Sequence, residues 1–225
     1  MAKPRFRGYT HTQRPKGFDM SDADRPQITL ITPPVFDLDI FPAQLAAVLD
    51  GVDIACLRLS LASKDEDHIA RAADAARVVA HARDVAIVID RHVLMVERHG
   101  LDGVHLPDGA RLVRKLRKDL GPDAIIGAYC GITRHEGMNA AEAGADYVAF
   151  GPVGATPLGT GEQVEFDLFE WWSAVIEVPV IAEGALTVAL VEKFAPVADF
   201  FGVGDEIWGT DNPVATLRAL LAPLG

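Results

Sequence analysis

The chain has 225 residues, a net charge of −11 and a hydrophobic fraction of 49%. This length suits one α/β barrel and can bury a full core without disulfide or metal staples. The acidic balance argues against a nucleic-acid surface, no apolar run is long enough to span a membrane, and no signal peptide is visible. Two cysteines far apart, Cys56 and Cys130, are typical of a reduced, cytoplasmic protein.

The N-terminal segment differs from the rest of the chain. It is basic up to its first acid, Asp19, and its prolines and glycines interrupt any periodicity. We predict a disordered basic tail over residues 1–26 and a single barrel domain over residues 27–225. A true start at Met20, or a nucleic-acid-binding arm, are the alternatives for this segment.

From residue 28 onward, β-rich runs alternate with Ala- and Leu-rich stretches of helical pattern. This alternation predicts a parallel sheet, and the nearly continuous apolar runs indicate strands buried on both faces. The predicted strands cover residues 28–32, 53–59, 85–90, 103–106, 124–129, 147–151, 178–183 and 199–204. Clear helical patterns cover residues 66–84, 110–120, 134–144 and 187–195.

A weak internal repeat gives the number of strands. A short turn closes a helix and opens a strand at Asp53, Asp102, Asp146 and Asp199. Each interval holds two strand–helix units, so four quarters predict eight strands and a (β/α)8 TIM barrel. An open doubly wound sheet is the alternative, although no Gly-x-Gly-x-x-Gly and no phosphate-loop Gly-Lys-Ser supports a nucleotide-binding version.

Polar residues at strand ends are the first candidates for chemistry, because TIM-barrel active sites lie on the loops that follow the strands. Arg58 and Ser60 end the second run and share one face by the two-residue period. Asp90 and Arg91 close the third run, and His105 closes the fourth. These five residues are therefore candidate catalytic or binding groups.

Each of these residues also has a structural interpretation. An unpaired buried guanidinium is costly, so Arg58 either binds a ligand or pairs with Asp90 or Glu183 in an ion network over the barrel mouth. His105 is either an acid/base group or a hydrogen-bonded histidine of the barrel interior.

The fifth and sixth strands are followed by hydroxyl groups and glycines. Tyr129 follows the fifth strand, and a Gly-rich loop that starts at Gly151 follows the sixth. Glycines leave backbone N–H groups free to approach an anion, and Thr156 adds a hydroxyl donor. We predict that this loop binds substrate; a surface loop without function is the alternative.

The loops after the last two strands are the usual phosphate site of this barrel. Three acids in these loops, Glu183, Asp205 and Glu206, would repel a phosphate. Either their side chains point away from the loops or the site has changed its ligand. The predicted phosphate-binding residues in these loops are Gly184, Gly202, Val203 and Gly204.

Four segments carry a resemblance to a known family: residues 101–106 (LDGVHL), 121–128 (GPDAIIGA), 140–153 (AAEAGADYVAFGPV, followed by Thr156-Pro157) and 178–186 (VPVIAEGAL). The chain resembles the thiamine phosphate synthase family, which includes the related thiazole tautomerases, over roughly residues 27–222. The resemblance implies a TIM barrel that joins hydroxymethylpyrimidine diphosphate to a thiazole phosphate. Pyrophosphate leaves, and the thiazole nitrogen captures the resulting pyrimidine cation.

The resemblance also implies site residues and a Mg²⁺ cofactor. Arg58 matches the family's second-strand arginine, and Asp90 with Arg91 matches its Asn-Asp-Arg motif, so Asp90 would be a Mg²⁺ ligand. The second metal aspartate of the family falls on Ala110, with Asp108 nearby.

Other family positions depart from the pattern. Cys56 stands where the family has a glutamine, and Ser60 where it has a lysine. The family serine after the fifth strand falls on Tyr129. In the Thr-Pro-Thr-Lys loop, Thr156 is kept, whereas the second threonine and the lysine fall on Leu158 and Gly159. Lys64, six residues past Arg58 on the following loop, is a candidate replacement cation.

Three functions follow from these observations. The first is a synthase-like transferase that acts on small phosphorylated thiamine precursors and depends on Mg²⁺. The second is a metal-free isomerase like the thiazole tautomerases, with His105 or Glu183 as the acid/base group. The third is a barrel that binds a thiamine metabolite without catalysis. A homodimer stays open as an alternative to a monomer.

Overall fold

The computed structural model describes residues 25–157 and 161–225. The predicted tail over residues 1–26 therefore lies almost entirely outside the described residues, as do Leu158 and Gly159 of the Thr-Pro loop. In the described part of the chain, no helix is both long and apolar enough to cross a membrane.

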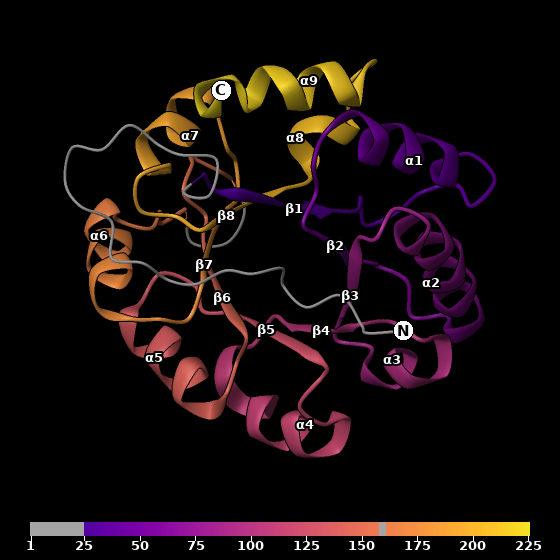
Figure 1. Cartoon of the computed structure of the whole chain (residues 1–225), viewed down its shortest axis with the longest axis horizontal. Coiled ribbons are helices and arrows are strands. Elements are labelled where there is room, and N and C mark those ends of the chain that lie inside the picture. The colour runs from indigo at the N-terminus through magenta and orange to yellow at the C-terminus, as the bar shows by residue number, and fades with distance from the viewer. Residues whose placement is uncertain (1–24, 158–160) are drawn as a thin grey trace.

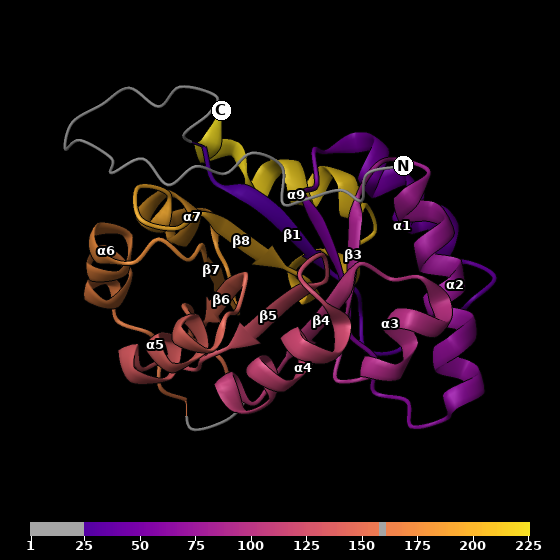
Figure 2. The same cartoon turned by 60° about the horizontal axis from the view of Figure 1, so that its bottom comes forward.

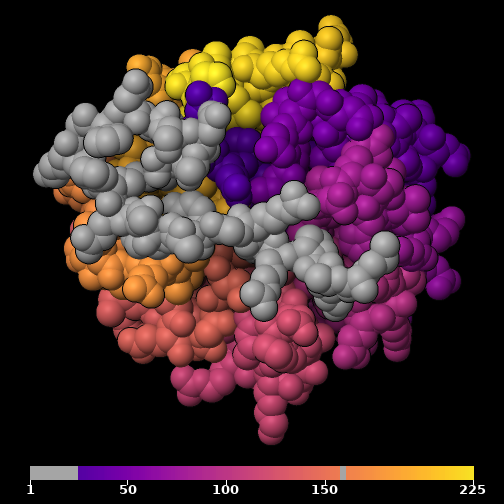
Figure 3. All heavy atoms as spheres, viewed as in Figure 1, coloured from indigo at the N-terminus to yellow at the C-terminus, as the bar shows by residue number. Residues whose placement is uncertain are grey.

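A closed parallel barrel of eight strands forms the centre of the molecule, with neighbours in the order β1 to β8 and β8 paired back to β1. This confirms the predicted TIM barrel and excludes the open sheet. Helices surround the strands as an outer ring (Figures 1 and 2). The space-filling view follows the same order, with the start of the barrel beside the C-terminal helix (Figure 3). The strands are β1 (Gln27–Ile31), β2 (Cys56–Leu59), β3 (Ala86–Asp90), β4 (Gly103–Leu106), β5 (Ile125–Tyr129), β6 (Tyr147–Phe150), β7 (Val180–Glu183) and β8 (Phe200–Val203).

Helices follow each strand, and α8 and α9 both follow β8. Three of the four predicted helical segments lie close to the observed ones, whereas the segment over 110–120 begins as a 3-10 turn at Gly109–Leu112 and becomes α-helical at Val113. The helices are α1 (Phe41–Gly51), α2 (Glu66–His81), α3 (Val93–His99), α4 (Val113–Leu120), α5 (Arg134–Ala143), α6 (Phe166–Val175), α7 (Val188–Phe194), α8 (Asp205–Trp208) and α9 (Pro213–Leu220).

The repeated aspartates join pairs of strands at the start of the barrel. Asp102 accepts the N–H of Ile87 at 2.8 Å, and Asp199 accepts the N–H of Val180 at 2.8 Å. Asp146 accepts the N–H of Ile126 in β5 at 2.6 Å. Each of these three carboxylates satisfies a backbone donor of the preceding strand, which gives the repeated aspartate a structural role.

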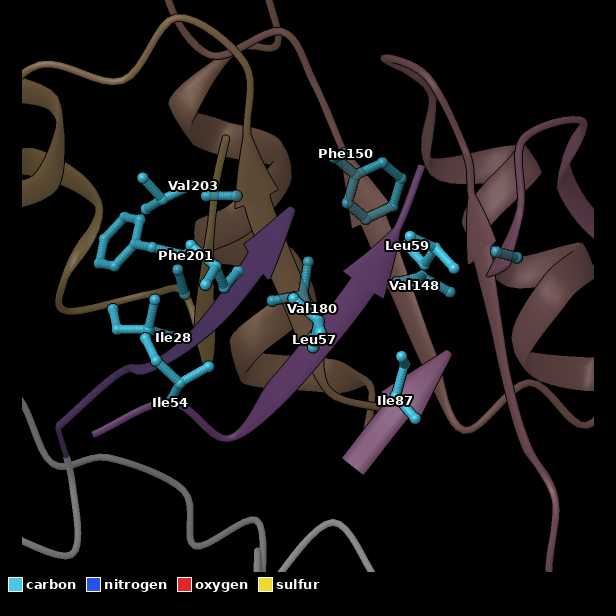
Figure 4. Close-up of a cluster of buried hydrophobic side chains, with 14 of the residues drawn as sticks. Ile28, Ile54, Leu57, Leu59, Ile87, Val148, Phe150, Val180, Phe201 and Val203 are labelled. Atoms are coloured by element: carbon cyan, nitrogen blue, oxygen red, sulfur yellow. The ribbon is translucent and has the colours of Figure 1, made fainter. Parts of the chain in front are cut away.

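Two apolar cores lie on the two faces of the strands. The smaller core fills the barrel interior and includes Tyr147 and Phe200. The larger core lies between strands and helices; Figure 4 shows part of it, with Leu57, Phe201 and Val203. Side chains alternate between the two faces along each strand. The interior core ends before the C-terminal ends of the strands, where polar side chains replace the apolar ones.

Candidate active site

A cavity of about 660 Å³ opens at the C-terminal ends of the strands. This is the end of a TIM barrel at which active sites are found. Most of the predicted site residues line it. They are Arg58, Ser60, Asp90, His105, Tyr129, Gly151, Thr156, Gly184, Gly202 and Gly204.

Two predicted residues do not line this cavity. Val203 is fully buried in the outer core, where Figure 4 shows it next to Phe201. It lies there because side chains alternate along β8, so that Gly202 faces inward and Val203 outward. Arg91 is exposed, has a left-handed backbone with φ of 64°, and donates its N–H to the carbonyl of His105.

Arg58 is the centre of the site and is paired with an acid from the opposite side of the barrel. Its Nη1 donates to Glu183 Oε2 at 2.7 Å and its Nη2 to Glu183 Oε1 at 3.2 Å. Its Nε lies 3.7 Å from Asp90 Oδ1. Burial disfavours the charged guanidinium, but Glu183 and Asp90 outweigh it and hold the pKa of Arg58 above its ordinary value. The ion network proposed as the structural alternative for Arg58 is thus present.

Gly202 provides the space for this pair. A Cβ at Gly202 would lie 2.9 Å from Glu183 Cβ and 3.0 Å from Glu183 Oε2. The glycine that we expected to approach a phosphate therefore accommodates a carboxylate side chain.

His105 lies beneath Arg58 and is only 2% exposed. Its Nε2 is 3.2 Å from Arg58 Nη1 and its Nδ1 is 3.0 Å from the hydroxyl of Tyr147. Burial and the charge of Arg58 hold its pKa well below the usual value, so the ring is neutral. Arg58 can only donate, so Nε2 accepts and Nδ1 carries the proton toward Tyr147. His105 therefore positions Arg58, and its Nε2 is not available as a general base in this arrangement.

Asp90 and Arg58 each keep one buried polar atom without a hydrogen bond, and the two atoms face each other at 3.7 Å. Asp90 Oδ1 and Arg58 Nε have no hydrogen-bond partner among the described residues. Such atoms are rare in native structures and mark a place for water or ligand. Burial raises the pKa of Asp90, and Arg58 opposes that shift. The two atoms therefore form a buried ion pair that is too long for a hydrogen bond.

Ser60 and Tyr129 frame the two sides of the cavity. The N–H of Ser60 donates to Thr32 Oγ1 at 3.0 Å, which fixes the chain after β2. The hydroxyl of Tyr129 donates to the carbonyl of Gly151 at the end of the neighbouring strand β6. Burial, followed by the negative charge of Glu183, raises the pKa of Tyr129. Its phenol therefore stays protonated at neutral pH.

The loop after β6 does not offer the backbone donors that we expected. Gly151 donates its N–H to Gly131 O at 3.1 Å, and Gly154 donates its N–H to Gly184 O at 3.0 Å. These glycines are needed for close packing, because a Cβ at Gly154 would lie 2.0 Å from the carbonyl oxygen of Ala185. Thr156 remains on the cavity wall.

A carboxylate occupies the loops after β7 and β8. Glu206 Oε1 accepts the N–H of Leu186 at 3.0 Å, and Glu206 Oε2 accepts the N–H of Gly204 at 2.8 Å. The sequence left open whether these acids point away from the loops. The side chain of Glu206 does not, because it points into them.

Sequence reasoning did not identify Tyr147 as part of the site. The only signal in the sequence was its inward position on the sixth strand.

The charge of the cavity is negative. Among the described residues that line it, the acids are Asp90, Glu183, Asp205 and Glu206, and Arg58 is the one permanent cation. In the part of the chain that the structure covers, no three His, Cys, Asp or Glu side chains cluster as a metal site.

Comparison with known proteins agrees with this architecture. The sequence profile described as "Thiamine monophosphate synthase" matches residues 28–203. The chain belongs to this family. A thiamine-phosphate synthase of Rhodospirillum centenum is 39% identical over 186 residues, which are 81% of this chain and 89% of that protein. A thiamine-phosphate synthase of Erythrobacter litoralis is 34% identical over 207 residues, 87% of this chain and 95% of that protein.

Among solved structures, a thiamine phosphate pyrophosphorylase from Pyrococcus furiosus is similar, with a TM-score of 0.76 at 17% identity. The match covers 88% of this chain and 95% of that chain. At this identity the likeness supports the barrel fold alone.

Proposed function

We propose that the chain is a transferase of the thiamine phosphate synthase type, which joins hydroxymethylpyrimidine diphosphate to a thiazole phosphate. Family membership over residues 28–203 carries the proposal. In this reaction the bond between the pyrimidine methylene carbon and the diphosphate oxygen breaks, and its electron pair leaves with pyrophosphate. The lone pair of the thiazole nitrogen then forms the new C–N bond. Charge develops on both fragments, so fixed electrostatic groups supply most of the catalysis.

Arg58 is the group that we assign to the leaving diphosphate. Its guanidinium is held by Glu183 and His105, and its buried Nε–H has no partner. Binding the diphosphate at Nε would satisfy this donor without breaking the pair with Glu183. The arginine is thereby oriented before the substrate arrives, which lowers the reorganisation that the reaction requires.

Asp90 is the residue that fits a Mg²⁺ ion. Mg²⁺ is commonly held by one or two carboxylates, by substrate phosphates and by water, and the Asp90 carboxylate lines the cavity. Bound there, Mg²⁺ would supply positive charge to the departing pyrophosphate. Asp108, the alternative second aspartate, is exposed and is not among the residues that line the cavity.

Three side chains remain to orient the organic parts of the substrates. Ser60 and Thr156 provide hydroxyl groups on two sides of the cavity, and the ring of Tyr129 provides a flat wall. The neutral phenol of Tyr129 adds no charge near the developing pyrimidine cation.

The test is pyrophosphate release by the purified full chain with both family substrates and Mg²⁺, with a chelator control. We expect Mg²⁺-dependent release, and we expect Asp90→Asn to lose about a hundredfold in kcat, the usual cost of one charge-stabilising group. Asp108→Asn is the matched control, because it removes the same charge outside the cavity. Full activity of Asp90→Asn would overturn the assignment.

One observation favours a second function, a metal-free isomerase like the thiazole tautomerases. The Asp90 carboxylate is already ion-paired with Arg58, and Ser60 stands where the family has a lysine. In this case turnover would persist in the chelator and release no pyrophosphate. Stabilisation of the protein by a thiamine metabolite, with no turnover of either kind, would instead indicate a binding protein.

A further inference from the structure

Three side chains in the barrel interior form a hydrogen-bonded chain that ends at Arg58. The hydroxyl of Tyr147 lies 3.0 Å from His105 Nδ1, and His105 Nε2 lies 3.2 Å from Arg58 Nη1. The three residues come from the alternate strands β2, β4 and β6, the arrangement that builds one layer of a TIM-barrel interior. Tyr147 is fully buried and is not among the described residues that line the cavity. Its hydroxyl therefore meets the site through His105.

Gly127 provides the room that lets the tyrosine reach the histidine. It lies on β5, between the strands of the other two residues, and is the register partner of both His105 and Tyr147. A Cβ at Gly127 would overlap the ring of Tyr147 at Cζ and at the hydroxyl oxygen. The rings of Tyr147 and His105 have an interplanar angle of 17°, and their centroids are 5.7 Å apart. The missing side chain and the register together place the tyrosine hydroxyl beside the imidazole.

The direction of both hydrogen bonds follows from Arg58. A guanidinium only donates, and Nη1 carries two N–H groups, one for Glu183 Oε2 and one for His105. His105 Nε2 is therefore the unprotonated nitrogen, and Nδ1 carries the proton. The other tautomer would place two donors face to face at 3.2 Å in the barrel interior. The partner of one ring nitrogen decides which nitrogen of a neutral imidazole is protonated, and the partner of Nδ1 is the hydroxyl of Tyr147.

We propose that Tyr147 is a positioning residue, which accepts the Nδ1–H of His105 and thereby holds the tautomer that orients Arg58. The inference rests on the proposed function, in which Arg58 binds the leaving diphosphate. Glu183 accepts from both Nη groups, His105 accepts from Nη1, and these three contacts fix the plane of the guanidinium. Tyr147 takes no part in bond breaking, because every proton of the chain stays on its own atom.

The alternative is that Tyr147 only fills space in the interior core, which also contains Ile125 and Phe200. In that case removing its hydroxyl would lower stability and would leave the tautomer of His105 unchanged. The two interpretations therefore differ in a property that can be measured on the histidine itself.

The first experiment measures the tautomer of His105 without catalysis. Long-range 1H–15N correlation spectra of the full chain distinguish protonated from unprotonated ring nitrogens, and the signals missing in His105→Gln assign His105 among the seven histidines. We expect a single tautomer with the proton on Nδ1 in the wild type, and loss of this single tautomer in Tyr147→Phe. Ile125→Val is the matched control, because it trims the same interior core without removing a hydrogen bond.

The second experiment measures pyrophosphate release as a double-mutant cycle. We expect Tyr147→Phe to lower kcat/KM for the diphosphate substrate about tenfold, the fold-change for one neutral hydrogen bond, and to leave KM for the thiazole phosphate unchanged. In the His105→Gln background the same change should have no further effect, because Tyr147 acts through the histidine. A loss caused by weaker packing alone would add in both backgrounds and would also appear in Ile125→Val.

The inference is overturned by a wild-type His105 with its proton on Nε2, by a tautomer that is unchanged in Tyr147→Phe, or by additive effects of the two substitutions. The wild-type spectrum needs no variant, so the inference stays testable if Tyr147→Phe does not fold. If the wild type releases no pyrophosphate, the transferase function fails, and the spectra alone decide whether Tyr147 sets the tautomer of His105.

Discussion

Neutralising Glu183 should change stability and diphosphate binding in opposite directions. Glu183 and Arg58 are 8% and 7% exposed, and two hydrogen bonds join them at 2.7 and 3.2 Å. Breaking a buried pair from one side costs about 3–5 kcal/mol, because the remaining charge loses its partner. In Glu183→Gln, Asp90 stays 3.7 Å from Arg58, and at that distance the attraction is about 4 kcal/mol at an effective dielectric of 20. We therefore expect the lower end of the range, about 3 kcal/mol.

Urea unfolding measures this loss as a shift of the midpoint at constant slope. The control is Asp119→Asn, which breaks the exposed pair with Lys115 and should cost only about 0.3–0.5 kcal/mol. Replacing both partners, as in Arg58→Met with Glu183→Leu, should recover most of the stability of the single variant. A loss below about 1 kcal/mol for Glu183→Gln would mean that water screens the pair, and the buried-pair reasoning would be refuted.

Glu183→Gln also tests how Glu183 affects binding of the diphosphate substrate. Removing the charge of Glu183 frees the Nη groups of Arg58 to bind the diphosphate. We expect KM for the diphosphate substrate to fall in Glu183→Gln while stability also falls. A KM that rises would show that Glu183 orients Arg58 for binding, and that its charge does not compete with the substrate.

The remaining predictions concern other parts of the barrel. Asp102→Asn should lower the free energy of unfolding by about 1–3 kcal/mol without changing kcat, because it weakens a buried backbone hydrogen bond far from the cavity; an unchanged urea midpoint would contradict this. Because the folded pKa of Asp90 is raised, its ionisation destabilises the fold as pH rises; Asp90→Asn should be more stable than the wild type at pH 7, with a gain that disappears on acidification below the ordinary aspartate pKa. Burial raises the pKa of Cys56 and of Cys130 to about 12, so both should resist iodoacetamide at pH 8 in the native state and react in urea; native-state labelling would contradict their burial.

The fold was predictable because its signals repeat. Apolar runs, helical patterns and the aspartate turns at 102, 146 and 199 recur along the chain, and each has a local physical cause. The outward position of Val203 was also readable, since Gly202 and Gly204 occupy the inward positions of a two-residue period.

The use of the loop donors was not predictable in the same way. Gly151 and Gly154 read as free anion donors in the sequence, but their N–H groups bond to carbonyls of other loops. The direction of Glu206 depends on how α8 docks on β1, and a helix of four residues carries no periodicity that would reveal it. Loop residues meet partners distant in sequence, so local pattern does not specify their contacts.

Glu183 and Glu206 are two of the acids that make the cavity negative, and both carboxylates are hydrogen-bonded within the chain. This bonding bears on how an acidic cavity is compatible with a family that acts on phosphates. Each carboxylate is hydrogen-bonded to donors of the chain itself: Glu183 to Arg58, and Glu206 to the loop amides. The two positions have different consequences. Arg58 keeps an unpartnered Nε beside Asp90, so the diphosphate end retains a donor, whereas both amides at the other end are satisfied. In the proposed function, Arg58 Nε is therefore the donor that is left for the leaving diphosphate, whereas the amides of Leu186 and Gly204 are already satisfied within the chain.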